Sequence, residues 1–491
     1  MNTFFLSHEL LVVGLGLALL LADLWISPAA KRKLGYVAAI GVGVVLLYSL
    51  FAVNLGPDEV KYAFGPDSDH GPFVLDSFAL FFKRFFLLAA LIVLLMSVEF
   101  ADRIETGIAE FYALILFALA GMLFASSAND FAMLFVSLEL ITVTFYVLTS
   151  FQRGQRRSLE AGVKYLIIGA LSTCFTVFGI ALIYGISGKL NFGELAIVAP
   201  LYRHHQIFLC GLLLVMVGLG FKIAAFPFQI WAPDVYQGAP APTTAFLAVG
   251  SKAAGFVLLL RVLFTAVPDI TLKSEQFSNL LIIVSAVTIL YGNLCALPQR
   301  NLKRLLGYSS IAHAGYMLLG VAALNSAGKS AVLYYLSGYL FTVLGAFTVI
   351  CLVMRHVEGE DVGGLAGLNQ RSPLLAATMS MAMVSLAGIP PLAGFFGKFL
   401  LLKSVVEQAP ERHGYYYLAF IAVAGVVISL YYYFGVIRAI YWSEDPSDLS
   451  PIQTSKPIRV SIYACMIGML FIGLFPGPLV NLANEAVKTL K

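Results

Sequence analysis

The chain has 491 residues, of which 60% are hydrophobic and 12% are charged, and its mean hydropathy is +0.88. Soluble globular proteins carry about 25% charged residues, so this composition excludes that class and indicates a membrane protein. The net charge of +4 is too small to indicate a nucleic-acid partner, and the five scattered cysteines form no disulfide or metal-ligand pattern.

Apolar runs follow one another along the whole chain. Since a membrane-spanning helix needs about 20 mostly apolar residues, the pattern predicts an all-α polytopic membrane protein with about fourteen transmembrane helices. The expected helices lie near residues 8–27, 34–54, 74–98, 108–126, 129–150, 159–185, 206–230, 242–265, 277–297, 303–325, 329–355, 372–404, 415–441 and 458–480. The first run precedes a basic cluster and lacks one before it, which favours a retained helix over a cleaved signal peptide.

Lysine and arginine gather in alternate connections, which predicts the orientation in the membrane. The basic connections are 31–33, 153–157, 300–304 and the pair Arg355 and Arg371. The connection 56–71 is mostly acidic, and 126–130 is nearly uncharged. We therefore expect the basic set in the cytoplasm and both termini on the periplasmic side. The acidic connection near 99–110 does not fit, because it falls in the cytoplasmic set.

Two of the apolar segments are interrupted by glycine and proline and also carry a lysine. They are "GLGFKIAAFPF" at 218–228, with Lys222, and "LAGIPPLAGFFGKF" at 386–399, with Lys398. The segments lie an odd number of spans apart, so they cross the membrane in opposite directions. Broken helices at corresponding positions of two halves are typical of inverted repeats and of an ion pathway.

This placement predicts four parts of the chain. Transmembrane helices 1–3 occupy residues 1–107, and two inverted five-helix repeats, each with a broken helix, occupy 108–265 and 277–441. A C-terminal transmembrane helix falls within 442–491.

Several ionisable side chains fall inside the expected spans. A lysine at the bilayer centre costs about 2.5–3.5 kcal/mol on insertion scales, so its charge must be compensated or used. The candidate proton-carrying residues are Glu139, Lys164, Lys222, Lys252, His313 and Lys398. Burial lowers the proton affinity of a lysine, and a nearby carboxylate raises it. A carboxylate that moves toward and away from a buried lysine would therefore drive proton uptake and release. Structural ion pairs or snorkelling side chains are the alternative explanation.

The individual candidates leave further alternatives open. His313 fits a relay by its ordinary pKa, but it also fits a satisfied buried histidine. Lys164 lies four residues after Glu160, so either an interfacial salt bridge or a relay role is possible. In the loop after the first break, Trp231 and Tyr236 are expected as interfacial anchors, and Asp234 as a loop or cap residue. Four other basic residues are expected to snorkel, namely Lys83, Arg84, Arg261 and Arg438.

The sequence contains no dinucleotide fingerprint, P-loop, haem motif or metal-ligand cluster. If the chain belongs to a redox machine, we expect its electrons to travel in other subunits.

At this point a family resemblance emerges. The stretch "GFKIAAFPFQIWAPDVYQGAPAPTTAFLAVGSKAAGF" at 220–256 resembles the signature of the antiporter-like subunits of respiratory complex I. Within that family, four stretches look like subunit N of the bacterial NADH–quinone oxidoreductases. They are "LELITVTFYVLTSF" at 138–151, "SLEAGVKYLIIGALST" at 158–173, "NLKRLLGYSSIAHAGYMLLG" at 301–320 and "SLAGIPPLAGFFGKF" at 385–399. The resemblance covers about residues 75–445.

The resemblance implies proton translocation driven by quinone reduction in neighbouring subunits, in a bacterial inner membrane. It implies no cofactor in this chain, with NAD, FMN, iron–sulfur clusters and quinone in other subunits. The implied partners are a neighbouring antiporter-like subunit, small membrane subunits and the lipid bilayer.

By the same resemblance, Glu139 matches the glutamate of the fifth helix, and Lys222 matches the lysine of the broken seventh. Lys252 matches the lysine of the eighth helix, and Lys398 matches the terminal lysine of the broken twelfth, where the related subunit M has a glutamate. Lys164 and His313 match less central polar positions. The related subunit L has a long lateral helix after its last span, which we do not expect here.

Three other classes remain as alternatives. A cation/proton antiporter subunit of the Mrp type shares the same helices and lysines, and sodium-dependent exchange would reveal it. A purely structural membrane subunit would use its charges only to hold helices together. A solute permease would need a substrate-specific polar cluster, which the sequence does not offer.

Overall fold

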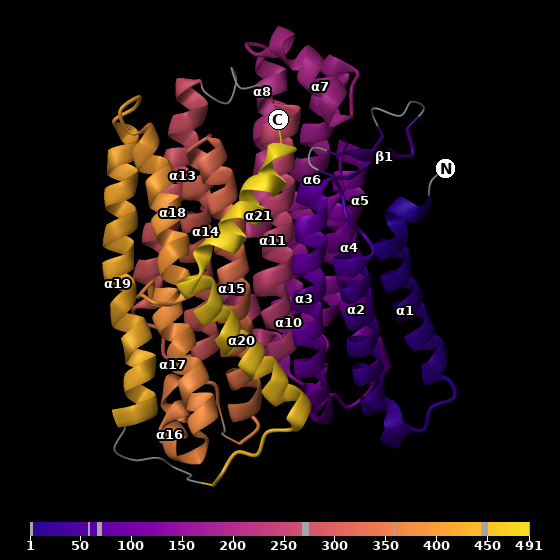
Figure 1. Cartoon of the computed structure of the whole chain (residues 1–491), viewed down its shortest axis with the longest axis vertical. Helices are drawn as coiled ribbons and strands as arrows, with labels where there is room; N and C mark the ends of the chain where they lie inside the picture. Colours follow the sequence, from indigo (N-terminus) through magenta and orange to yellow (C-terminus); the bar gives the residue numbers. More distant parts are fainter. Residues whose placement is uncertain are drawn as a thin grey trace.

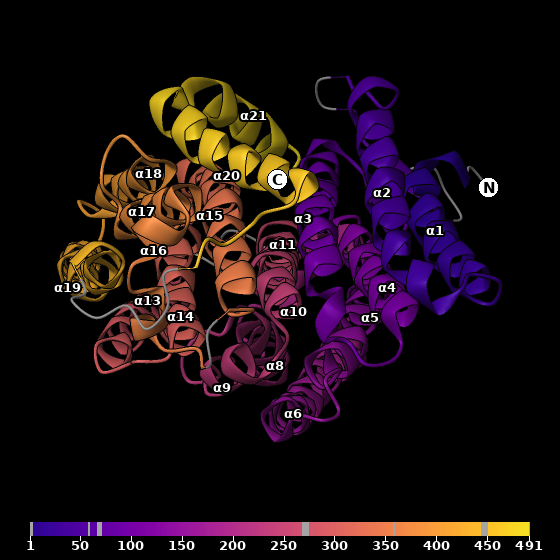
Figure 2. The same ribbon diagram turned by 90° about the horizontal axis from the view of Figure 1, so that it is seen from below.

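The molecule is an upright bundle of helices (Figures 1 and 2). This computed structural model describes residues 3–56, 59–65, 71–267, 274–356, 359–442 and 450–490. The all-α membrane architecture predicted from the sequence is confirmed. Residues 57–58 and 66–70 of the predicted acidic connection lie outside the described part.

The helices follow the apolar runs closely. In the first half they are α1 (Ser7–Asp23), α2 (Leu34–Phe51), α3 (Ser77–Phe100), α4 (Ile108–Ser126), α5 (Phe131–Thr149), α6 (Arg156–Ser187), α7 (Phe192–Val198), α8 (Gln206–Ile223), α9 (Ala232–Gly238), α10 (Ala241–Phe246) and α11 (Lys252–Arg261). In the second half they are α13 (Glu275–Ala296), α14 (Leu302–Ala322), α15 (Ser326–Val353), α16 (Leu368–Arg371), α17 (Pro373–Ala387), α18 (Ala393–Gln408), α19 (Gly414–Trp442), α20 (Lys456–Leu474) and α21 (Pro476–Lys488). A turn of π-helix at Leu247–Ser251 joins α10 to α11, and a second at Val262–Ala266 extends α11, so that Ala241–Ala266 is one continuous span.

Acidic and amide side chains set several helix starts. Asp76 accepts a hydrogen bond from Ala79 N at the start of α3, and Asp130 accepts one from Met133 N at the start of α5. Such N-cap side chains satisfy amide groups that have no partner inside the helix. The starts of α3 and α5 therefore follow from single residues placed just before an apolar run.

Among the described residues, twelve helices are long and apolar enough to cross a membrane. Two of our expected spans are not among these helices. The first corresponds to α1, and the span near 372–404 is divided into α17 and α18; each of these three helices is shorter than 18 residues. The count of fourteen spans and the inverted repeats stay predictions.

The middle of the bundle consists of the span formed by α10 and α11 together with α14 and α15 (Figure 2). The apolar stretch of the span Ala241–Ala266 is buried throughout, and that of α15 is 94% buried. By contrast, only 28% of the apolar stretch of α6 is buried, so α6 turns most of its surface outward. Polar groups on the central helices are thus shielded from lipid by the outer ones.

Three small elements differ from the prediction. Strands β1 (Lys61–Ala63) and β2 (Phe73–Leu75) pair antiparallel, with Lys61 opposite Leu75, so the chain is not purely helical. The predicted last span near 458–480 is wrong at its end, because α20 stops at Leu474 and a separate helix, α21, begins at Pro476. A proline cannot continue the helical hydrogen bonding, which explains the stop. Helix α21 packs against α15 and α3.

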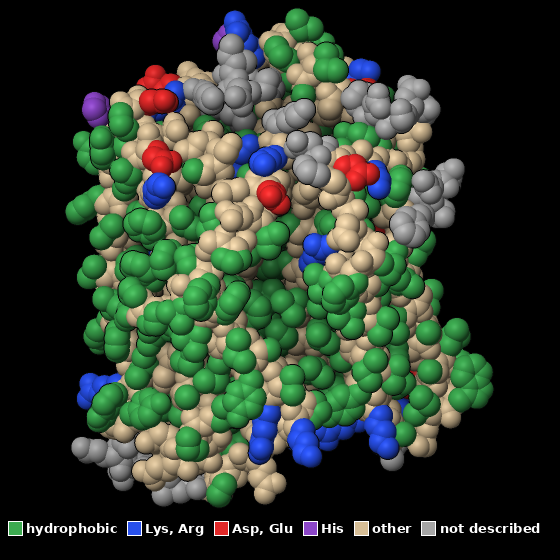
Figure 3. Space-filling model, viewed as in Figure 1, with side chains coloured by type: hydrophobic (Ala, Val, Ile, Leu, Met, Phe, Trp, Pro, Cys, Tyr) green, Lys and Arg blue, Asp and Glu red, His purple; other side chains and the backbone are tan. Residues whose placement is uncertain are grey.

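The acidic connection near 99–110 has a structural explanation. Asp102 pairs with Arg32 at 2.8 Å and with Arg355 at 2.5 Å, and Glu99 pairs with Arg355 at 2.9 Å. These carboxylates lie on the basic side because they neutralise arginines from two other connections. The face drawn in Figure 3 shows lysine and arginine gathered along its lower rim, whereas its upper half carries acidic and basic groups side by side.

Two basic residues expected to snorkel are instead fully buried ion-pair partners. Lys83 on α3 pairs with Glu9 on α1 at 2.8 Å, and neither side chain is exposed. Arg261 at the end of α11 donates two hydrogen bonds of 2.7 Å to Asp76, so α11 is tied to the start of α3. The snorkelling prediction is wrong for these two, because partners far away in sequence hold them inside.

We predict that Asp76→Ala strongly destabilises the protein. Arg261 would lose its bidentate partner and remain as a buried unpaired charge, for which the expected loss is about 3–5 kcal/mol. The measurement is the midpoint of thermal unfolding in detergent. Glu59→Ala, which breaks an exposed pair with Lys61, is the matched control and should change little. Equal midpoints for both variants would contradict a structural role for the buried pair.

Candidate functional site

Lys222 occupies the last turn of α8, directly before the helix breaks. Ala224 adopts a left-handed conformation with φ of 58°, and Ala225 N donates to Gly220 O at 2.9 Å, which closes the helix end. The indole of Trp231 donates to the freed carbonyl of Phe221 at 3.0 Å. The break is therefore satisfied inside the protein, as a membrane environment demands.

The ammonium group of Lys222 has no hydrogen-bond partner among the described residues, although its side chain is only 3% exposed. It lies 5.8 Å from the ring centroid of Tyr165 on α6. The C-terminal end of a helix carries partial negative charge, which favours a cation in this last turn.

Glu139 on α5 is half-buried and accepts a hydrogen bond of 2.6 Å from Thr173 on α6. It forms no ion pair with Lys222 in this structure, although the two charges interact electrostatically. The expected pair is thus not a direct contact, and both side chains lie against α6, Glu139 at Thr173 and Lys222 near Tyr165.

Lys252 starts α11 near the middle of the span Ala241–Ala266 and is 2% exposed. Its ammonium donates to the backbone carbonyl of Ser310 on α14 at 2.6 Å and also contacts the Ser310 hydroxyl. That hydroxyl lies 2.7 Å from the hydroxyl of Tyr236 on α9. Three elements therefore meet in one polar contact, and Tyr236 is buried there and is not the interfacial anchor we expected.

His313 lies one helical turn further along α14 and uses both ring nitrogens. Nδ1 lies 2.5 Å from the hydroxyl of Tyr335 on α15, and Nε2 lies 2.9 Å from the hydroxyl of Tyr433 on α19. The Tyr433 hydroxyl is also 2.5 Å from the hydroxyl of Ser309. Since tyrosine and serine hydroxyls both donate and accept, the hydrogen bonds of this cluster can point in either direction.

Lys398 lies on α18, just beyond the second break. Its ammonium donates to Leu386 O at 2.7 Å and to Ala387 O at 3.2 Å, which are carbonyls at the end of α17. It also lies 4.8 Å from the ring centroid of Tyr316 on α14. The interruption of the helix thus supplies the acceptors that a buried ammonium requires.

Lys164 does not belong with the other candidates in space. Its side chain is 41% exposed and pairs with Glu160 at 2.6 Å and with Asp234 at 2.7 Å. Asp234 in turn pairs with Arg304 at 2.5 Å. This network joins α6, α9 and α14 near the basic side, so Asp234 is more than the loop or cap residue we expected. Trp231, our other expected anchor, is buried.

The structure therefore brings Lys252, His313 and Lys398 together around α14 and leaves Lys222 and Glu139 as a neighbouring unit. The sequence analysis missed the hydroxyl groups that complete the row, which belong to Tyr236, Tyr335 and Tyr433. The available signal was weak, because tyrosines are common in this chain and nothing in the spacing of these three separates them from the rest. Within the described ranges, no group of His, Cys, Asp and Glu is arranged to hold a metal ion.

Comparison with known proteins matches this arrangement to one class. Residues 128–429, more than half of the chain, match the family described as the transmembrane NADH:quinone oxidoreductase/Mrp antiporter. The protein is thus an antiporter-like membrane subunit.

Individual relatives narrow the assignment. NADH-quinone oxidoreductase subunit N of Heliobacterium modesticaldum is 37% identical over 492 residues, which cover 100% of both chains. A chain of respiratory complex I from Thermus thermophilus with bound aureothin is 31% identical, with a TM-score of 0.78 over 97% of this chain and 99% of that one. The chain belongs to the family of NADH-quinone oxidoreductase subunit N.

The Mrp complex of Dietzia sp. DQ12-45-1b contains a chain that is 21% identical to this one. Its TM-score is 0.80, over 100% of this chain and 98% of that chain. At this identity the likeness shows a shared fold alone.

We predict that Gly388→Ala destabilises the second break. Gly388 ends α17 with φ of 84°, and an added Cβ would lie 2.9 Å from Cδ of Lys398. A left-handed conformation costs a residue with a side chain about 1–2 kcal/mol. The thermal unfolding midpoint should fall, and it should be unchanged or higher in Gly185→Ala, where nothing lies near the added Cβ. A stable Gly388→Ala variant would show that the break tolerates a side chain.

Proposed function

We propose that this chain translocates protons along the row of buried groups centred on α14. The observation that carries the proposal is the set of side-chain contacts that joins Lys252, Ser310 and Tyr236 beside His313 and its tyrosine partners. As a member of the subunit N family, the chain is a membrane subunit of a proton-translocating NADH-quinone oxidoreductase. NAD, FMN, iron–sulfur clusters and quinone belong to other subunits of that assembly.

The chemistry of the row suits proton transfer. An ammonium group held by carbonyl and hydroxyl oxygens, as at Lys252, gives up a proton when its surroundings stop favouring the charge. His313 lies between two hydroxyls, so it accepts a proton on one side and releases one on the other. Because neighbouring groups titrate together, the proton belongs to the row and not to one residue.

Glu139 and Lys222 are proposed as the switch of this system. In the present conformation they interact without direct contact, and the lysine is buried without a hydrogen-bond partner among the described residues. A shift that brings the carboxylate closer would stabilise the charged lysine, and separation would release its proton. Coupling to quinone reduction would then consist of controlling this distance from a neighbouring subunit.

The proposal includes a topology. The basic connections face the cytoplasm of a bacterium, and both termini face the periplasm across the inner membrane. Residues 108–265 and 277–441 form two inverted repeats, between the helices of 1–107 and the last span in 442–491. Two broken spans support this arrangement, since each carries a buried lysine next to its break, Lys222 at the end of α8 and Lys398 near the start of α18.

A structural role is the second candidate, and one observation favours it. The ammonium groups of Lys252 and Lys398 are satisfied by backbone carbonyls, as in a purely architectural contact. The two roles predict different results when a buried lysine is replaced by an uncharged residue. Proton translocation predicts loss of pumping in an assembled complex, and a structural role predicts loss of assembly.

We predict that Lys222→Ala abolishes coupled activity and leaves assembly intact. Removing a positioned proton-transfer group typically costs about 10²–10⁴-fold in rate, and Lys222 makes no hydrogen bond whose loss would weaken the fold. Proton pumping and quinone reductase turnover would be measured in parallel in inside-out membrane vesicles.

A native gel reports assembly, and Lys189→Ala is the matched lysine control, because the Lys189 side chain is 42% exposed and pairs with nearby Glu194. Loss of the assembled complex would favour the structural role. Full pumping in the assembled Lys222→Ala variant would sink the proposed switch.

We also predict that Tyr433→Phe slows proton pumping without loss of assembly. The change removes one hydroxyl, which contacts both His313 and Ser309, and keeps the ring. The readout is the pumping rate at fixed protein amount, with Tyr417→Phe on the exposed face of α19 as the control. Equal rates for the two variants would remove the His313 cluster from the pathway.

A further inference from the structure

His8 on α1 is a buried histidine that lies outside the proton-carrying row. Its side chain is 1% exposed, and neither ring nitrogen has a hydrogen-bond partner among the described residues. The ring packs against Tyr48 on α2, with 5.7 Å between the ring centroids. Burial without a hydrogen-bond acceptor favours the neutral imidazole over the charged one.

The charges that face His8 are already unequal. Lys83 on α3 pairs with Glu9 at 2.8 Å, whereas the neighbouring Arg84 donates at 2.7 and 3.0 Å to two backbone carbonyls at the end of α2. Both cations interact electrostatically with His8. One carboxylate therefore faces two cations, and protonation of His8 would add a third positive charge to the buried cluster.

The other elements near the start of α1 add no charge that would compensate this excess. Helix α4 packs against α1, and its single charged residue, Glu110, lies in its first turn beside the connection that follows the far end of α1. On β1, Lys61 is paired with Glu59 at 2.9 Å. Within the described ranges, a charged His8 would thus have no carboxylate of its own.

The same cluster fixes the start of α1 to two other helices. The Glu9–Lys83 pair joins it to α3, and the hydroxyl of Tyr48 on α2 donates to the hydroxyl of Ser7 at 3.2 Å. The His8 ring lies between these two contacts in the sequence and packs on the same tyrosine. Turning His8 toward water therefore requires the start of α1 to leave both helices.

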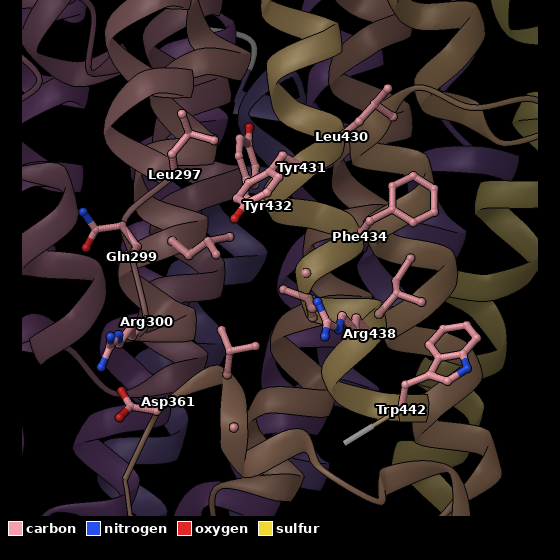
Figure 4. A pocket seen from close by; sticks show the side chains of 16 residues that line it. Leu297, Gln299, Arg300, Asp361, Leu430, Tyr431, Tyr432, Phe434, Arg438 and Trp442 are labelled. Carbon is pink, nitrogen blue, oxygen red and sulfur yellow. The ribbon is translucent and has the colours of Figure 1, made fainter. Parts of the chain in front are cut away.

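The cluster is closed to the surroundings. By contrast, a groove of about 1180 Å³ opens along α19 at the other end of the bundle, where Arg438 and Trp442 are exposed (Figures 2 and 4). The groups that line this groove are reached from outside in the present conformation. His8 has no such access, so a proton reaches it only when the start of α1 moves.

We propose that His8 is a pH-sensitive latch that docks the start of α1 onto α2 and α3. The docked form holds the imidazole neutral, and the undocked form exposes it to water, where a histidine has its ordinary pKa of about 6.5. Because only the undocked form binds the additional proton, docking is strongest above pH 6.5 and weakens as the pH falls below it. From pH 7.5 to pH 5.5 the equilibrium constant for undocking should rise about tenfold, as linkage to one proton requires.

In the topology proposed above, the start of α1 faces the periplasm. The latch would then respond to the acidity of the compartment that receives the translocated protons. Docking itself needs neither this orientation nor turnover, so the latch and the proposed function stand or fall separately.

The experiment measures hydrogen–deuterium exchange of the assembled complex in detergent at pH 7.5 and at pH 5.5. Each exchange rate is divided by the intrinsic rate of the same peptide at that pH, so that only the opening of the structure remains. We expect the protection of residues 7–14, the first turns of α1, to fall about tenfold at pH 5.5. Helix α15, whose apolar stretch is 94% buried and which contains no histidine, is the internal reference and should keep its protection.

His8→Gln keeps a polar side chain that cannot be protonated, so its protection should be the same at both pH values. His204→Gln is the matched control, because His204 is exposed, and the tenfold change should remain in this variant. Unchanged protection of residues 7–14 in the unmodified protein would overturn the proposal, whether or not the variants assemble. An equal loss in α15 would indicate general destabilisation by acid, and a loss that persists in His8→Gln would indicate another group; either result would also overturn it.

Discussion

The structure depends on one constraint, which is that the protein itself must compensate a buried ammonium, either with hydrogen-bond acceptors or with the partial negative charge of a helix end. At Lys398 the ammonium needs acceptors and the last carbonyls of α17 need donors. The ammonium donates to these carbonyls, so both needs are met by the same hydrogen bonds. A continuous helix would have used those carbonyls for its own amides. The break is thus part of the charge's environment, and the helices around it pack to keep that environment closed.

Buried charges fall into two groups in this bundle. The pairs Glu9–Lys83 and Asp76–Arg261 are tightly matched, fully buried and distant from the central row, so they hold helices together. Lys222, Lys252 and Lys398 have no carboxylate partner within ion-pair distance in the described residues. In a matched pair, each partner stabilises the charged form of the other. The protonation of an unmatched lysine, by contrast, changes with any charge that approaches it. This difference separates architecture from chemistry more reliably than burial does.

Much of the fold could be predicted, because hydropathy and interrupted spans act locally. The apolar runs predicted most helices within a few residues. Lys222 and Lys398 stood out in the sequence because each is a charged residue in an interrupted apolar run. What could not be predicted depends on contacts between distant segments. Lys83 and Arg261 look like residues near span ends, and only the positions of Glu9 and Asp76 make them interior. The tyrosines around His313 were missed because three helices, α14, α15 and α19, supply the cluster together.

The pairing of Arg32 and Arg355 with Asp102 has a consequence for how the protein enters its membrane. During insertion the helices emerge one after another, and arginines influence orientation while acidic residues contribute little. In the proposed orientation, Arg32 therefore acts as a free positive charge until Asp102, its acidic partner, has been synthesised. Once the bundle closes, the same side chains are cross-braces between the ends of distant helices. A single set of arginines thus serves first as a topological signal and later as a clamp.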